Sequence, residues 1–319
     1  MILEVPYTTG PTRDSGKGSG VAAGLPQKRE HDMRLANILS GLAAGITSVT
    51  MAGVALADDG IKGLEIIGRP VADATGFQPA ASELARDQQW LDGMLLYLCI
   101  GVTLFVVALL AIVIVRFNSR SNPTPARFTH NTPLEIVWTL VPIVVLVVLG
   151  AFSLPILSKQ VEMPAADVTI KVTGNQWFWS YEYPDAGISF DSLLLAKEEL
   201  AANGYSPDEY LLAADNAVVV PVHKNIVVHV TASDVIHGWF VPSLAVQHSA
   251  VPGRIGELWF NADKEGIYFG QCTTLCGKDH AYMPIVVKVV SQQVYDDWVA
   301  RTKQASNAAP ATVQVAASN

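Results

Sequence analysis

Two long uncharged runs of apolar residues constrain the fold of this chain more than any other feature. The first run covers residues 93–115 and the second covers residues 136–157. At a rise of about 1.5 Å per residue, each run forms a helix of about 33 Å, which is long enough to cross the hydrocarbon core of a bilayer. Because only helices and closed barrels satisfy their backbone polar groups inside lipid, the sequence predicts a transmembrane helical hairpin over residues 93–157.

The residues that flank the two runs indicate how the hairpin is oriented. Arg116, Arg120 and Arg127 lie in the short loop between the runs, and no acidic residue occurs there before Glu135. Short loops rich in Lys and Arg stay in the cytoplasm, so both ends of the hairpin are predicted to lie on the exported side. Two helices alone have little to bury in lipid, and a larger membrane partner is therefore expected.

The N-terminal part of the chain has the pattern of a secretory leader. Basic residues precede an apolar stretch at residues 35–57, which closes with Ala-Leu-Ala before two aspartates. This pattern is typical of a signal peptide, so residues 1–57 are predicted to be leader and signal peptide, with Met33 as an alternative true start. An uncleaved membrane helix is the other interpretation. Acidic residues predominate in residues 58–92, which are predicted to be an extracytoplasmic segment.

Beyond residue 157 the hydrophobic pattern changes to the alternation expected of strands. Short β-branched or aromatic runs occur at residues 168–172, 177–183, 218–222, 226–231, 257–260 and 285–290. Several short strands separated by turn residues predict an antiparallel β-sandwich over residues 158–300. Within it, residues 193–203 are predicted to be helical and residues 206–209 match a capping box. Residues 301–319, rich in Ala, Ser and Asn, are predicted to be a disordered tail.

A loop near the end of this domain concentrates side chains that bind soft metal ions. Cys272, Cys276, His280 and Met283 form the pattern Cys-x3-Cys-x3-His-x2-Met. Thiolate and thioether ligands favour copper, and imidazole also suits it. Attachment of a c-type haem would need Cys-x-x-Cys-His, so that cofactor is not indicated. A disulfide between the two cysteines and a closed zinc site are the alternatives, although neither requires Met283.

A further imidazole precedes this loop. His237 follows the predicted strand at residues 226–231, which places it on a loop at one end of a sheet. If the fold brings it beside the cysteine loop, the site contains two imidazoles, two thiolates and one thioether. A mononuclear blue-copper site uses only one cysteine. Two thiolates that bridge two copper ions, each with one histidine, would use every donor, and such a pair favours fast electron transfer.

The charge of the chain limits its partners. The net charge is −8, and acidic residues outnumber basic ones about two to one in residues 158–300. A nucleic-acid partner is therefore not expected. The acidic surplus either keeps the domain soluble or steers a basic protein partner, which would raise the association rate at low salt.

Glu135, at the start of the second apolar run, has two interpretations. Thr132, Pro133 and Glu135 match a capping box, with Thr132 as the N-cap, Pro133 at the first helical position and Glu135 at the third. A carboxylate at the edge of a membrane span is also a candidate for a proton pathway. The residues alone leave both interpretations open.

Taken together, these segments resemble cytochrome c oxidase subunit II of the bacterial, mitochondrial-like type over roughly residues 60–300. The segments that carry the resemblance are residues 126–135 (ARFTHNTPLE), 176–183 (QWFWSYEY), 234–237 (DVIH), 251–254 (VPGR) and 270–284 (GQCTTLCGKDHAYMP). The resemblance implies a two-helix transmembrane hairpin followed by an all-β, cupredoxin-like Greek-key sandwich that carries a dinuclear copper A centre. It also implies cytochrome c, the haem-bearing subunit I and subunit III as partners. The implied location is the bacterial inner membrane, with the sandwich on the periplasmic side.

The resemblance also assigns roles to individual residues. The copper ligands that it implies are Cys272 and Cys276 as bridging thiolates, His237 and His280 as imidazoles, Met283 as a weak thioether and Thr274 through its backbone carbonyl. Trp177 matches the aromatic residue through which electrons enter, although its alternating strand fits a tryptophan packed inside the sandwich equally well. Glu135 matches the carboxylate at the mouth of a proton channel into subunit I. The acidic positions that match the cytochrome c docking surface are Glu182, Asp191, Asp215 and Asp234.

One position departs from the family pattern. Thr274 stands where the family usually has Glu, whose side chain reaches a magnesium ion beside subunit I. A hydroxyl is a poorer magnesium ligand than a carboxylate, so magnesium ligation is left open. The implied function is that of a subunit that accepts electrons from cytochrome c and passes them to haem in subunit I. The whole complex would be a proton-pumping oxidase that reduces oxygen to water. The rivals are a copper-delivery protein and a quinol oxidase subunit that has lost copper.

Overall fold

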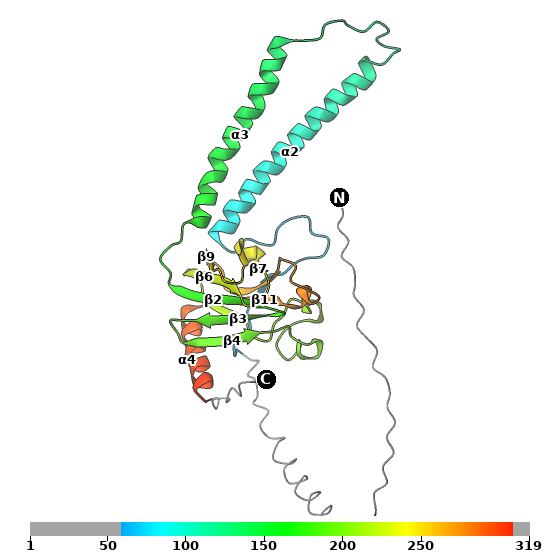
Figure 1. Cartoon of the computed structure of the whole chain (residues 1–319). Coiled ribbons are helices and arrows are strands. Elements are labelled where there is room, and N and C mark those ends of the chain that lie inside the picture. Colours follow the sequence, from blue (N-terminus) through cyan, green and yellow to red (C-terminus); the bar gives the residue numbers. More distant parts are fainter. Residues whose placement is uncertain (1–58, 309–319) are drawn as a thin grey trace, which may run out of the picture. The chain divides into compact units, whose positions relative to one another are not determined.

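The computed structural model describes residues 59–308. Two long helices, α2 (Glu83–Arg116) and α3 (Thr132–Val161), precede a domain built from two sheets, and the helix α4 (Gln292–Ala308) follows it (Figure 1). Both α2 and α3 are long and apolar enough to cross a membrane. The predicted leader and signal peptide, with Met33, lie outside the described residues, as do residues 309–319.

The start of α3 differs from the prediction by one residue. Asn131, and not Thr132, is the N-cap: its side chain accepts a hydrogen bond from the Leu134 N–H at 3.2 Å, and Glu135 accepts one from the Asn131 N–H at 3.1 Å. Asparagine is a stronger N-cap than threonine, and Thr132 and Pro133 then occupy the first helical turn. Glu135 therefore does stabilise the start of the helix.

The domain that follows is a sandwich of two sheets. One sheet has the strand order β5-β11-β10-β7-β8, with β1 also paired to β10, and the other has the order β4-β3-β2-β6-β9. The strands of the first sheet are β1 (Ile66–Gly68), β5 (Val218–Pro221), β7 (His237–Val241), β8 (Val246–Ala250), β10 (Gly266–Cys272) and β11 (Pro284–Val290). The strands of the second sheet are β2 (Val168–Asn175), β3 (Phe178–Tyr183), β4 (Ile188–Ser192), β6 (Asn225–Ala232) and β9 (Gly256–Asn261). The predicted all-β sandwich is confirmed.

The prediction that the sandwich is purely antiparallel is wrong. Strand β2 pairs with β6, and β5 pairs with β11, in parallel. Parallel partners need a crossover connection, and here the chain visits the opposite sheet between the two strands of each pair. Period-two alternation shows which side chains face the core, but it carries no information about strand direction.

The two sheets enclose a core of aromatic and branched aliphatic side chains. On β3 the buried residues Trp179, Tyr181 and Tyr183 alternate with Ser180 and Glu182, which lie on the outer face. Burial of a large apolar side chain stabilises a fold by about 1.5–3 kcal/mol. The alternation therefore fixes the register of this strand, and it leaves a polar outer surface near one end of the sandwich.

The insertion between β4 and β5 is not the helix predicted at residues 193–203. Only single 3₁₀ turns form, at Lys197–Glu199 and Pro207–Glu209. Residues 193–195 are instead extended and pair with residues 213–215, where Leu194 forms a β-bridge with Ala214 and the Leu195 N–H donates to the Ala213 carbonyl at 3.1 Å. The predicted capping box is confirmed, because Glu209 accepts a hydrogen bond from the Ser206 N–H at 2.6 Å. A small apolar cluster in the insertion covers the outer side of β10 and β11.

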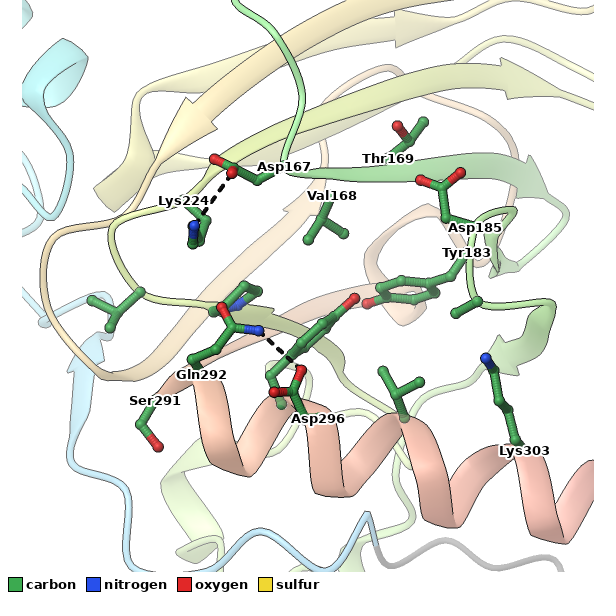
Figure 2. Close-up of a pocket in the computed structure, with 15 residues that line it drawn as sticks. Asp167, Val168, Thr169, Tyr183, Asp185, Lys224, Ser291, Gln292, Asp296 and Lys303 are labelled. Carbon is green, nitrogen blue, oxygen red and sulfur yellow. Dashed lines mark hydrogen bonds and ion pairs between the residues drawn. The ribbon is translucent and has the colours of Figure 1, made fainter.

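Helix α4 corrects the predicted boundary of the tail. The helix continues to Ala308, so residues 301–308 are helical rather than disordered. Trp298 is buried and lies edge-on to Tyr183, with ring centroids 5.3 Å apart. A groove of about 650 Å³ remains between α4 and the sandwich, where Figure 2 shows the Asp167–Lys224 ion pair facing the helix. Tertiary packing thus extends the helix beyond what its composition indicates.

The residues before α2 form what we call the N-terminal strap, residues 59–69, which lies against the sheet that contains β10 and β11. Its first residue, Asp59, forms an ion pair with Lys288 of β11 at 2.6 Å, and both side chains are nearly buried. Strand β1 adds to β10 in parallel, and Arg69 ends the strap in an ion pair with Glu209 of the insertion at 3.5 Å. A segment far from the sandwich in sequence is therefore part of its structure.

The helical hairpin is bonded to the sandwich at both of its ends. Ser82, the N-cap of α2, donates to the Leu244 carbonyl at 2.8 Å. Lys159, near the end of α3, pairs with Asp87 of α2 at 2.8 Å, and its carbonyl accepts a hydrogen bond from Trp259 Nε1 at 3.1 Å. The start of α2 and the end of α3 are thus held to each other and to the sandwich.

Candidate metal centre

Strand pairing brings the two predicted ligand segments together. His237 is the first residue of β7, Cys272 is the last residue of β10, and Cys272 pairs with Trp239 across these antiparallel strands. His237 therefore lies beside the loop that follows Cys272, at the start of a strand and not on the predicted loop. The close approach needs Gly238, because a Cβ there would lie 2.3 Å from the Thr273 hydroxyl.

The predicted donor atoms converge in this corner. The sulfurs of Cys272 and Cys276 lie 3.9 Å apart, and both thiols are free. Each sulfur has its own imidazole, with Nδ1 of His237 4.0 Å from Cys272 Sγ and Nδ1 of His280 3.6 Å from Cys276 Sγ. The sulfur of Met283 lies 3.6 Å from Cys276 Sγ. His237 and Met283 are almost completely buried, so the donors face one another and not solvent.

These separations fit a metal site. A disulfide holds its sulfurs about 2.05 Å apart, far closer than the 3.9 Å between Cys272 and Cys276. Metal bonds of about 2.3 Å to sulfur and about 2.0–2.1 Å to nitrogen let one ion span a sulfur–nitrogen separation of up to roughly 4.4 Å. Both sulfur–imidazole pairs are shorter than this. The Thr274 carbonyl oxygen lies 3.3 Å from Cys272 Sγ, which is also close enough for one ion to bind both atoms.

Asp234 organises the site in a way that the sequence prediction did not include. Its carboxylate accepts hydrogen bonds from His237 Nε2 at 2.9 Å, from the Gln176 N–H at 2.7 Å and from the Val235 N–H at 2.6 Å. A carboxylate can only accept, so Nε2 of His237 carries a proton, and Nδ1, which faces Cys272, is the ring nitrogen that can bind a metal ion once it is unprotonated. Metal-ligating histidines have this arrangement. The Asp-x-x-His spacing in the sequence was the signal for it.

The two thiols differ in acidity. Burial alone would raise the pKa of Cys272, but hydrogen bonds from His237 and from neighbouring backbone groups outweigh burial and lower it. Burial and the adjacent Cys272 thiolate raise the pKa of Cys276 to about 12. At neutral pH, therefore, a cation that binds both sulfurs must displace a proton from Cys276. Binding should release protons and strengthen as pH rises.

Trp177 is not a core residue of the sandwich. It occupies the turn between β2 and β3, half-buried, whereas its neighbour Trp179 fills the core and donates from Nε1 to the Met283 carbonyl at 3.1 Å. Gln176, in the same turn, donates from Nε2 to the Cys276 carbonyl at 2.8 Å. The sequence prediction missed both hydrogen bonds. They fix the turn that carries Trp177 directly against residues 272–283, which we call the ligand loop.

The four predicted docking residues do not share one environment. Asp191 is exposed, whereas Asp215 is half-buried, and burial raises the pKa of Asp215 with a smaller contribution from the nearby Asp191 charge. Glu182 lies on the outer face of β3 but pairs with Lys171 at 2.9 Å. The carboxylate of Asp234 is occupied by the bonds described above. Asp191 and Asp215 are thus brought together, whereas Asp234 belongs structurally to the metal centre.

Glu135 is far from this centre. It lies in the first turn of α3, about 36 Å along the helix from Lys159 at the sandwich end. The structure gives it the capping role and does not test a role in proton transfer.

Comparison with known proteins places these features in one family. The sequence matches the family described as Cytochrome C oxidase subunit II, periplasmic domain, over residues 168–290, and the one described as Cytochrome C oxidase subunit II, transmembrane domain, over residues 70–156. It is similar to cytochrome c oxidase subunit 2 of Cereibacter sphaeroides, with 50% identity over 298 residues that cover 88% of this chain and 98% of that relative. The chain belongs to the cytochrome c oxidase subunit II family.

Other members of the subunit II family are also similar. The probable cytochrome c oxidase subunit 2 of Rickettsia bellii is 44% identical over 241 residues, which cover 75% of this chain and 88% of that relative. A solved structure of the periplasmic domain of subunit II (CoxB) of Bradyrhizobium japonicum is 47% identical, covers 45% of this chain and 99% of its own, and has a TM-score of 0.41. As a subunit II, the chain is a membrane protein with two spanning helices and part of an oxidoreductase complex with other oxidase subunits.

Removing the carboxylate of Asp234 should weaken metal binding. In Asp234→Ala, His237 loses the acceptor that fixes its ring and tautomer, so copper affinity should fall about 10–100-fold. Copper titration of the purified subunit against a competing chelator measures this. Asp185→Ala, which removes an exposed acidic residue outside the site, is the matched control. Equal affinity in the two variants would contradict the role assigned to Asp234.

Proposed function

We propose that this chain is the subunit of the oxidase that receives electrons, and that it holds a pair of copper ions at the candidate metal centre. Cys272 and Cys276 would bridge the pair, with His237 and His280 as imidazole ligands and Met283 as the thioether. The carbonyl of Thr274 would complete the set. When bound, the copper pair supplies a one-electron carrier between cytochrome c and the haem-bearing subunit I.

One observation carries this proposal: two free thiols lie 3.9 Å apart, and each has a separate imidazole within 4.0 Å. A site for one ion would need only one of these sulfur–imidazole pairs. The duplicated arrangement, together with soft donors that favour copper, supports two ions bridged by sulfur.

The remaining residues of the site prepare it for rapid electron exchange. Burial of His237, Cys272, Cys276 and Met283 keeps water away from the ligands. Asp234 holds the His237 ring, and the Trp179 and Gln176 hydrogen bonds hold the ligand loop through its carbonyls. Ligands that are fixed before the charge changes need little rearrangement when it does.

The electron donor in this proposal is cytochrome c, a basic protein. It would dock over Trp177, guided by Glu182, Asp191, Asp215 and Asp234, and Trp177 would pass electrons to the adjacent ligand loop. Asp191 contributes most to steering, because it is exposed, whereas Asp215 is half-buried and the carboxylates of Glu182 and Asp234 are paired with Lys171 and His237. The sandwich would lie on the periplasmic side of the bacterial inner membrane, with subunits I and III as neighbours.

Two further roles complete the proposal. Glu135 would stand at the mouth of a proton channel into subunit I, in addition to capping α3. Magnesium ligation is not assigned, since Thr274 offers a hydroxyl where a carboxylate would be needed.

Metal analysis of the purified oxidase tests the proposal. We expect two copper ions per chain, a visible absorption spectrum and oxidation of cytochrome c. One colourless, exchangeable copper ion would indicate a delivery protein, and retained zinc would indicate a structural site. Absence of copper with oxidation of quinol would indicate a quinol oxidase. Any of these three results would overturn the copper-pair assignment.

A further inference from the structure

The loop that carries the ligands also places a positive charge on the surface proposed for the electron donor. Lys278 Nζ lies 4.9 Å from the centroid of the Trp177 ring, and the Lys278 side chain is 75% exposed. Cations within about 6 Å of an indole face are attracted by its quadrupole. Among the described residues, no other basic side chain lies over this ring.

We propose that Lys278 determines which electron donors this subunit accepts, by covering Trp177 with an ammonium group that opposes a basic residue of the donor at that point. The inference rests on the proposed function, in which the donor docks over Trp177. It adds a repulsive element to a surface whose other assigned residues are acidic. Discrimination between partners commonly needs such an element as well as attractive ones.

The backbone holds Lys278 in this place. Gly277, which precedes it, has a φ of 134°, a conformation that other residues rarely adopt. A Cβ at Gly277 would also lie 2.8 Å from Cζ2 of Trp177. Gly277 therefore lets the loop lie directly on the Trp177 indole, and the Lys278 side chain lies across the face of that ring.

The Lys278 side chain stays exposed to a partner although its ammonium already has a neighbouring carboxylate. Lys278 forms an ion pair with the adjacent Asp279, which also keeps it near the ring. The Asp234 carboxylate is occupied by His237 and the turn of Gln176. A donor that approaches Trp177 thus meets a positive charge at the centre of the proposed surface, while the exposed Asp191 and the half-buried Asp215 provide negative charge on it.

This arrangement selects a particular chemistry in the donor. A basic protein whose surface opposite Trp177 is uncharged can use the outer acidic residues and avoid Lys278. A protein with a lysine or arginine at that point must place like charges together in a partly desolvated contact, which slows association. The preferred donor is therefore a basic protein with an uncharged patch at the point of electron transfer.

The test uses the assembled oxidase and a reduced soluble cytochrome c that has a lysine beside its electron-transfer patch. In Lys278→Met, kcat/KM at low ionic strength should rise about three- to tenfold with kcat unchanged, and Lys278→Glu should raise it further. The gain should disappear as salt screens the charges. Lys264→Met, which removes an exposed lysine paired with Glu65 at the opposite end of β10, is the control and should show no gain.

Parallel variants separate the inference from the function on which it rests. Asp191→Asn combined with Asp215→Asn should lower kcat/KM at low salt. If that pair lowers kcat/KM but Lys278→Met leaves it unchanged or reduces it, with copper content normal, the role of Lys278 is overturned and the docking surface stands. If neither changes the rate, the docking surface and the role of Lys278 are both overturned.

Discussion

Replacing Cys276 by serine should abolish the proposed copper pair and, with it, the proposed oxidation of cytochrome c. A serine hydroxyl is a hard, protonated group at neutral pH and cannot replace a bridging thiolate. Loss of a group that only supports a metal ligand costs about 10–100-fold in metal affinity. Loss of a ligand shared by both ions should therefore lower the affinity by more than about 100-fold. Copper per chain should fall from two to one or fewer, and the visible absorption of the pair should disappear.

The third cysteine provides the matched control for this result. Cys99 lies in α2, exposed and far in sequence from the ligand loop, so Cys99→Ser should keep full copper content and activity. Cys272→Ser should behave like Cys276→Ser, because each sulfur has one imidazole of its own. A Cys276→Ser protein that keeps two copper ions would show that the sulfurs do not bridge.

Neutralising Asp59 should destabilise the sandwich strongly, although Asp59 precedes the membrane helices. In Asp59→Asn the ammonium of Lys288 keeps its charge in a site where its side chain is only 8% exposed. Removing one partner of a buried ion pair costs about 3–5 kcal/mol in the free energy of unfolding, because the other charge is left uncompensated. The unfolding midpoint should fall by about 10 °C, as followed by circular dichroism of the detergent-solubilised protein.

The double variant Asp59→Asn with Lys288→Met separates charge from packing. Replacing a buried pair with uncharged groups of similar volume is often nearly neutral, so the double variant should recover most of the stability. Lys264→Met, which breaks the exposed pair with Glu65, should change stability by less than about 1 kcal/mol. An Asp59→Asn protein as stable as the parent would show that the N-terminal strap does not hold the sandwich.

The features that follow from local pattern could be predicted from the sequence, and those that depend on long-range pairing could not. The two spans, the alternation on β3 and the cluster from Cys272 to Met283 are local, and each has a clear physical signature. The parallel pairing of β2 with β6 and the role of residues 59–69 depend on partners far away in the sequence. No periodicity in either segment indicates its partner.

The candidate centre shows the same division. Its soft donors were evident from residue type and spacing, and His237 from its place after a predicted strand, and the family resemblance implied the same ligand role. The second role of Asp234 became visible only when β7 and the turn at Gln176 were brought together. The predicted helix at residues 193–203 failed for a related reason, since the pairing of residues 193–195 with residues 213–215 and the contacts with β10 override a moderate helical propensity.

The bonds at Ser82 and Lys159 have a consequence for the proposed transfer of electrons to the neighbouring subunit. If a single flexible linker joined the domain to the membrane, the domain would change its position above the bilayer. The distance between the proposed copper pair and the haem of the neighbouring subunit would then vary. Here the domain is bonded to the start of α2 and to the end of α3, and these two helix ends are also bonded to each other, which restricts such motion. In the proposed function, these anchors would limit changes in the height of the ligand loop above the lipid, and the arrival of the donor would be the step that responds to ionic strength.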